Sequence, residues 1–231
     1  MKQILTLILF LIFPITINAQ EEMQLLPVDW KNIQKEVKEH PEYVKRLVAR
    51  LSAEEIDTTM TLPERILAFY GQSFLTNDAE EKYRIDMDKL AEAGKIEECL
   101  AMAKNILEIN PLHLKALVTA GNSLIVMAKD STRWKDVTIE DGRRFFRRAI
   151  LIFDTIAMTG DGSASRPFSV TKVSDEYCFM RYYLNLWDYK KQTLSGNCDV
   201  ITLDGSSDYY DEPEIYFEIT RVLELERLLF K

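Results

Sequence analysis

Apolar side chains recur at every third or fourth position from about residue 29 to residue 157, which is the spacing of one face of an α-helix. Polar start signals divide this stretch into separate helices. Asp29 can cap the first of them, and Thr61 stands three residues before Glu64 as in a capping box. Pro63 is tolerated in the first turn of the helix that follows. We therefore expect helices joined by short turns through the first two thirds of the chain.

Residues 83–124 carry a repeated helical register. Gly94 separates two apolar faces, and Asn110-Pro111 ends the second helix because proline cannot continue it. Gly121 falls where a close neighbour helix needs a small residue. The pattern resembles a tetratricopeptide repeat at Tyr83, Leu90, Gly94, Cys99, Ala103, Pro111, Leu117, Gly121 and Leu124. Such repeats stack into concave surfaces that bind peptides or partner proteins, and flanking helices, including one over 139–157, are expected to complete the stack.

The pattern changes after residue 157. The segment 158–167 is rich in glycine and serine and predicts a boundary loop, and residues 168–173 alternate as a strand does. Ser174 is expected to cap a helix that has Asp175 and Glu176 in its first turn. "QTLSGNCDVITL" and "IYFEIT" predict one further strand each, before a last amphipathic helix. The predicted fold class is therefore α+β: a tetratricopeptide-like helical part over 20–158 and a small mixed part over 159–231, with a three-stranded sheet and two helices.

Residues 1–19 have the pattern of a secretory signal peptide. Lys2 precedes an apolar run over 4–17, and Ala19 offers a cleavage site. The run is short for a membrane span, and no second apolar segment of spanning length follows it, although an uncleaved anchor is the alternative. We expect a periplasmic or secreted protein without an integral membrane segment once the signal is removed.

The C-terminal texture, "TGDGSASRPFSVTKVSDEYCFMRYYL" with "QTLSGNCDVITLD" and "IYFEIT", resembles a bacterial family of small exported proteins, the domain of unknown function 4919 family. The upstream stretch "DTTMTLPERILAFYGQSF" and the signal peptide also resemble that family. The resemblance implies a signal peptide, a repeat-like helical front and a mixed end. It implies no activity, cofactor or catalytic residue.

Charge and composition disfavour several function classes. The chain has 29 basic and 37 acidic residues, and the resulting net charge of −8 disfavours nucleic-acid binding. Three cysteines at irregular spacing make neither a zinc site nor a disulfide scaffold, although a Cys178–Cys198 bridge remains an alternative in an exported protein. His40 and His113 are expected to be turn residues. We predict no metal and no cofactor.

Two short loops could bind ions. Gly160-Asp161-Gly162 could offer backbone donors to phosphate, and the acidic segment 204–212 could offer oxygen atoms to calcium. Neither has the flanking elements of a phosphate loop or a calcium-binding helix-loop-helix. A bend and a solvated hairpin loop are the favoured interpretations.

Two clusters remain as candidate binding residues. The arginines are Arg143, Arg144, Arg147 and Arg148, which could dock an acidic peptide or a glycan-linked anion, or pair with neighbouring carboxylates. The acids are Asp175 and Glu176. Adjacent carboxylates on a helix point in different directions, which disfavours a catalytic pair. The expected function is a non-enzymatic binding or assembly module of the bacterial envelope with a protein or peptide partner. The alternative is a carboxylate-based hydrolase of envelope or extracellular polymers.

Overall fold

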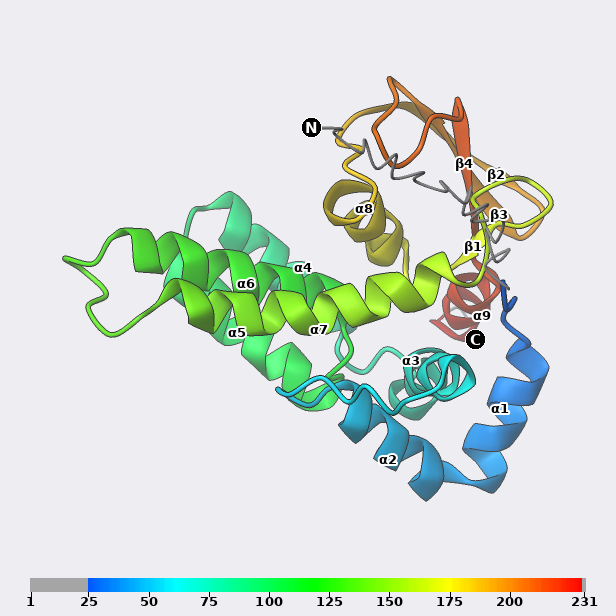
Figure 1. The fold of residues 1–231 in the computed structure, drawn as a ribbon, viewed down its shortest axis with the longest axis horizontal. Coiled ribbons are helices and arrows are strands. Elements are labelled where there is room, and N and C mark those ends of the chain that lie inside the picture. Colours follow the sequence, from blue (N-terminus) through cyan, green and yellow to red (C-terminus); the bar gives the residue numbers. More distant parts are fainter. Residues whose placement is uncertain (1–24, 230–231) are drawn as a thin grey trace, which may run out of the picture.

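The computed structural model describes residues 25–229 and shows an α+β fold (Figure 1). The predicted signal peptide lies outside the described residues. Seven helices precede the sheet: α1 (Trp30–Glu39), α2 (Pro41–Leu51), α3 (Leu62–Thr76), α4 (Glu81–Glu92), α5 (Ile96–Ile109), α6 (Leu114–Lys129) and α7 (Ile139–Ala157). Two more, α8 (Val173–Tyr182) and α9 (Thr220–Leu229), flank the strands β2 to β4 in the sequence.

The start signals predicted at Asp29 and Thr61 are confirmed. Asp29 Oδ1 accepts a hydrogen bond from the backbone nitrogen of Asn32 at 3.0 Å. At α3, the Thr61 backbone nitrogen donates to Glu64 Oε2 at 2.8 Å, while the Glu64 nitrogen donates to Thr61 Oγ1 at 3.4 Å. The capping box therefore satisfies two backbone donors that the first helical turn leaves free.

Helices α4 to α7 pack side by side and extend away from the sheet (Figure 1). Gly94 has a φ of +67° in the turn between α4 and α5, a conformation that favours glycine. At the α6–α7 contact, a Cβ on Gly121 would lie 2.7 Å from Cε2 of Phe146. The expectation that Gly121 leaves no room for a larger side chain is confirmed.

The sheet has four strands, not the three predicted. Their order is β1 (Phe168–Ser169), β4 (Glu214–Glu218), β3 (Cys198–Leu203) and β2 (Tyr189–Ser195), with only the β1–β4 pair parallel. The predicted single strand "QTLSGNCDVITL" is a hairpin, because Gly196 takes a φ of +65° in a two-residue turn and the chain reverses there. The first strand is also shorter than predicted, because α8 begins at Val173 and Lys172, not Ser174, is its N-cap residue.

One hydrophobic core joins the helical part and the sheet. Phe153 of α7, Phe168 of β1 and Phe217 of β4 all belong to it, together with Phe179 of α8. The ring centroids of Phe168 and Phe179 are 4.9 Å apart. The predicted boundary near residue 158 stays a prediction. The described core contains residues from both sides of it.

Hydrogen bonds join segments that lie far apart in the sequence. Helix α9 lies between the sheet and α3 (Figure 1), and its buried Arg221 donates from Nη2 to the carbonyl oxygen of Ser73 and to Asn77 Oδ1, each at 2.8 Å. Trp30 Nε1 of α1 donates to Glu218 Oε2 of β4 at 2.6 Å. Strand β4 and helix α9 are thus bonded to α1 and to the end of α3.

Candidate functional site

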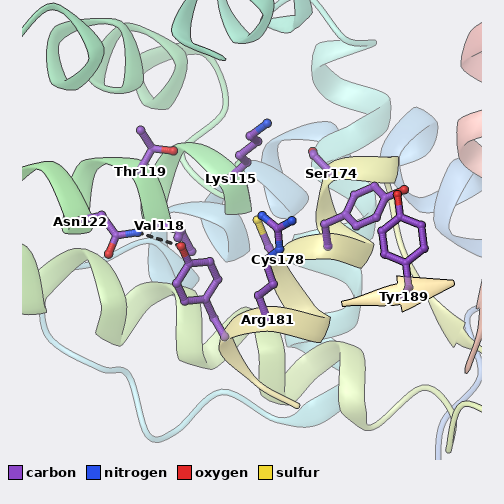
Figure 2. A pocket seen from close by; sticks show the side chains of 10 residues that line it. Lys115, Val118, Thr119, Asn122, Ser174, Cys178, Arg181 and Tyr189 are labelled. Atoms are coloured by element: carbon purple, nitrogen blue, oxygen red, sulfur yellow. Dashed lines mark hydrogen bonds between the residues drawn. The ribbon is translucent and has the colours of Figure 1, made fainter. Parts of the chain in front are cut away.

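A groove of about 430 Å³ lies between α6 and α8 (Figure 2). Helix α6 contributes Lys115, Val118, Thr119 and Asn122; helix α8 contributes Ser174, Tyr177, Cys178, Arg181 and Tyr182; and β2 contributes Tyr189. We call this set the α6–α8 groove.

Helical periodicity explains why these side chains share the groove. The α6 residues are spaced i, i+3, i+4 and i+7, and Ser174, Tyr177, Cys178 and Arg181 repeat that spacing on α8. Residues at this spacing lie on one face of a helix. The two faces are turned toward each other, and Tyr189 at the start of β2 joins them from the sheet (Figure 2).

The groove is lined by two cations and, within the described residues, by no carboxylate. Lys115 Nζ is 2.7 Å from Asp88 Oδ1, so its charge is partly balanced outside the lining. The Arg181 side chain is exposed and makes neither an ion pair nor a hydrogen bond to any residue of 25–229. In a chain with a net charge of −8, the groove is therefore a locally positive surface with a guanidinium open to a ligand.

Aromatic rings flank this positive surface. Tyr182 is 40% exposed and Tyr189 is 42% exposed. The rings of Tyr177 and Tyr189 are 5.7 Å apart, and Trp187, beyond the groove, is 6.0 Å from the ring of Tyr182. Asn122 Nδ2 donates to the Tyr182 hydroxyl at 2.9 Å and bridges the two helices (Figure 2). Partly exposed tyrosine and arginine are enriched where proteins bind partners.

The side chains between the helices offer little nucleophilic chemistry. Burial raises the pKa of the Cys178 thiol to about 12, so it stays protonated at neutral pH. Ser174 Oγ is buried and has no hydrogen-bond partner among the described residues, nor does a histidine line the groove. The arrangement therefore suits reversible binding better than covalent catalysis.

The predicted acid Asp175 has a structural role. Its Oδ2 accepts hydrogen bonds from Thr171 Oγ1 at 2.8 Å, from the Thr171 backbone nitrogen at 3.2 Å and from the Lys172 backbone nitrogen at 3.1 Å. Burial raises the pKa of Asp175 to about 6, against the lowering effect of these hydrogen bonds. Asp175 thus holds the backbone just before α8 by hydrogen bonds, and it does not line the groove.

The second acid, Glu176, faces the sheet. Gln192 Nε2 donates to Glu176 Oε2 at 3.4 Å and to Asp199 Oδ2 at 2.9 Å, which links α8 to β2 and β3. Burial and then the neighbouring Asp199 raise the pKa of Glu176 to about 10, so this carboxyl keeps its proton. The structure does not bring Asp175 and Glu176 together in an open cleft.

The four candidate arginines lie along α7, away from the groove lining. Arg144 is 4.0 Å from Glu54, and Arg147 is 2.7 Å from Glu140. Arg148 Nη2 donates to the Pro111 carbonyl oxygen at 2.8 Å. Arg143 is exposed, and among residues 25–229 it has no ion-pair partner. The other three arginines make intramolecular contacts, so fewer of their hydrogen-bond donors are free to bind a partner.

Comparison with known protein families gives one match, described as "Domain of unknown function (DUF4919)", over residues 31–227. The chain belongs to this family. No curated protein and no solved structure matches the sequence. The resemblance to the DUF4919 family is thereby confirmed, and the tetratricopeptide-like resemblance is not.

Sequence reasoning missed the groove of this DUF4919 chain. The spacing of Ser174, Tyr177, Cys178 and Arg181 was available as a signal on α8. Tyr189 comes from another element, and its approach to Tyr177 depends on how the sheet packs. The α8 face of the groove could therefore be found from the sequence. The groove itself could not, because it depends on how α8 is placed relative to α6 and β2.

The described residues also bear on the expectations for metal ligands, membrane-spanning helices, cysteines and histidines. Residues 25–229 contain no group of three or more potential metal ligands, and none of their helices has the length and apolar character needed to cross a membrane. Cys99, Cys178 and Cys198 are free, so the alternative Cys178–Cys198 disulfide is not formed. Burial lowers the pKa of His113 to about 3, and its neutral Nδ1 accepts a hydrogen bond from the Ala116 nitrogen at the start of α6.

Proposed function

We propose that this protein is a non-enzymatic binding module of the bacterial envelope that holds an anionic partner in the α6–α8 groove. The observation that carries the proposal is the exposed Arg181, which has no ion-pair partner within residues 25–229 and stands in a lining that contains no carboxylate from those residues. Tyr182 and Tyr189 flank it. A guanidinium of this kind binds a carboxylate or phosphate through two parallel hydrogen bonds. The signal-peptide pattern of residues 1–19 supports a periplasmic or secreted location.

The hydrolase alternative has weaker support. A glycoside hydrolase places two carboxyl groups on either side of the bond that it cleaves. Asp175 is committed to the start of α8, and Glu176 is fully buried against Gln192 and Asp199. Neither carboxyl lines the groove, so a polymer bound there would meet no general acid.

The proposal is tested by capturing envelope components with immobilised protein and three charge-reversed variants. Arg181→Glu is expected to weaken capture about tenfold or more, because a hydrogen bond to a charged group contributes about 1.5–3 kcal/mol. Arg143→Glu tests the arginine edge of α7, and Arg46→Glu, on exposed α2 surface, is the control for net charge.

The outcome separates the candidate sites. Loss of capture in Arg181→Glu alone supports the groove, and loss in Arg143→Glu alone would move the site to the arginine edge. Turnover of an envelope polymer by purified protein, abolished by Glu176→Gln, would replace the binding proposal with the hydrolase alternative.

A further inference from the structure

Strand β2 forms the edge of the sheet and pairs only with β3 in the described structure. A register shift lies between Tyr189 and Lys191, after which Lys191 to Ser195 run in regular register with β3. All β2 residues except Gln192 are exposed, and Leu194 is 60% exposed. An edge strand of this kind has a row of backbone donors and acceptors that another extended segment can pair with.

The edge begins at the groove. Tyr189 is both the first residue of β2 and part of the groove lining, next to Tyr177 (Figure 2). A chain paired with β2 would therefore run directly into the α6–α8 groove. Its end at Tyr189 would meet the surface that carries Arg181 and Lys115.

Charge selects the direction of that chain. An antiparallel neighbour of β2 ends at Tyr189 with its C-terminus, whereas a parallel neighbour begins there with its N-terminal ammonium group. The guanidinium of Arg181 attracts a terminal carboxylate and repels an ammonium group. The geometry therefore favours an antiparallel C-terminal tail.

The two faces of β2 define the side chains of the tail. Leu194 shares the α8 side of the sheet with Gln192, whose side chain contacts Glu176, whereas Lys191 lies on the opposite side. A paired strand would place apolar residues beside Leu194 and acidic residues beside Lys191. A second copy of β2 is a poor occupant, because β2 contains Lys190 and Lys191 and no acidic residue, so two copies offer each other no complementary charge.

We propose that the partner is the C-terminal tail of another protein, which adds to β2 as an antiparallel strand and places its terminal carboxylate beside Arg181. The tail alternates apolar and acidic side chains. This inference rests on the proposed function, because both use Arg181 in the α6–α8 groove.

The test uses the synthetic peptide acetyl-Glu-Val-Glu-Val-Glu-Val with a free C-terminus. Two modified peptides accompany it: a C-terminal amide, which removes the terminal charge, and a version with N-methylated valines, which removes backbone donors. Each is titrated against wild-type protein and Arg181→Gln by calorimetry. We expect each modification to weaken binding to wild-type protein about tenfold, which corresponds to 1.4 kcal/mol.

The variant provides the decisive comparison. In Arg181→Gln, the free peptide and the amide should bind equally, because the group that senses the terminal charge is gone. The Arg181 side chain is exposed and makes no ion pair or hydrogen bond within residues 25–229, so this variant is expected to fold as the wild type does. Hydrogen exchange should slow in β2 amides when the free peptide is bound.

The results that would overturn the inference differ from those that would overturn the proposed function. Equal binding of the N-methylated peptide, or no binding of the free peptide, excludes strand addition, while capture by the groove can still be lost in Arg181→Glu. Binding of an acidic oligosaccharide such as a uronate trimer, lost in Arg181→Gln, would keep the groove and replace the peptide. A concentration-dependent dimer in sedimentation that involves β2 would make a second copy the occupant.

Discussion

At the scale of single residues, Gly121 and Glu176 show how strongly the structure constrains one side chain. Gly121 lies against Phe146 at the α6–α7 contact, where the carbonyl oxygen of Gly142 would also be 3.2 Å from an added Cβ. Glu176 lies fully buried beside a second carboxyl group. The first position tolerates no added volume, and the second tolerates no added charge.

The Gly121→Leu variant is expected to lose about 1–3 kcal/mol of unfolding free energy, because the new side chain overpacks the helix contact. Gly205→Leu is the matched control, since a Cβ there would meet nothing within 4 Å. Urea unfolding of both variants measures the difference. Equal stability of the two would contradict the close packing of α6 against α7.

The Glu176→Gln variant should change how stability depends on pH. In the unfolded chain the carboxyl ionises near pH 4.5, whereas in the folded protein it keeps its proton up to a pKa of about 10. The wild type therefore loses stability as pH rises through this window, by up to about 1.4 kcal/mol per pH unit.

Glutamine keeps the shape of the protonated acid and does not titrate, so Glu176→Gln should gain stability relative to the wild type from about pH 5 to pH 8. Chemical denaturation across this range measures the change, with the exposed Glu54→Gln as control. A constant difference between variant and wild type would show that Glu176 is ionised in the folded protein.

At the scale of elements, α8 connects the parts of the molecule. Its N-cap Lys172 pairs with Asp78 and lies 3.3 Å from Glu80, both just before α4. Its groove face meets α6, and Glu176 meets β2 and β3 through Gln192. The position of α8 thus determines both the groove and the attachment of the sheet.

The Lys172→Met variant should cost about 3–5 kcal/mol, because it leaves the fully buried Glu80 without its cation. Lys190→Met, which breaks the exposed pair with Asp204, is the control and should cost less than about 1 kcal/mol. Thermal and urea unfolding compare the two. A small effect of Lys172→Met would mean that Glu80 takes up a proton at little cost.

The sequence predicted the elements with local signals and missed those that depend on distant partners. The caps at Asp29 and Thr61 and the bounds of α7 follow from neighbouring residues, and they are confirmed. The parallel pairing of Phe168 with Phe217 joins residues far apart in the chain. The hairpin turn at Gly196 is an exception, because its signal is local and the predicted strand nevertheless ran across it. The groove was the least predictable feature, because it forms only when two helices and a strand are placed next to one another.

At the scale of the whole molecule, α1 near the start of the described residues is bonded to β4 near their end. Trp30, near the start of the described chain, bonds to Glu218, and the ring of Trp30 is 5.3 Å from that of Tyr70. The Tyr70 hydroxyl donates to the Ser169 carbonyl oxygen at 2.7 Å. These bonds tie the first helices to β1 and β4, so the helical part and the sheet are expected to unfold together.

The proposed location gives a prediction for the intact chain. Expressed with its own N-terminus in a bacterium with an envelope, the protein should be cleaved after Ala19 and recovered with the periplasmic or secreted fraction from Gln20 onward. N-terminal sequencing and fractionation measure this, with Lys2→Glu and charged replacements in the run over 4–17 as controls. An intact Met1 in the cytosolic fraction would contradict it.

The buried Arg221 has a consequence for the order of folding. Its guanidinium lies 3.9 Å from the centre of the Phe74 ring and bonds to Ser73, so the end of α3 is completed by a residue that is synthesised 148 positions later. Until Arg221 is synthesised, the Ser73 carbonyl oxygen has only its bond from the Asn77 backbone nitrogen, and the Phe74 ring has no guanidinium against it. A chain that ends before α9 is therefore expected to leave the packing of α3 incomplete.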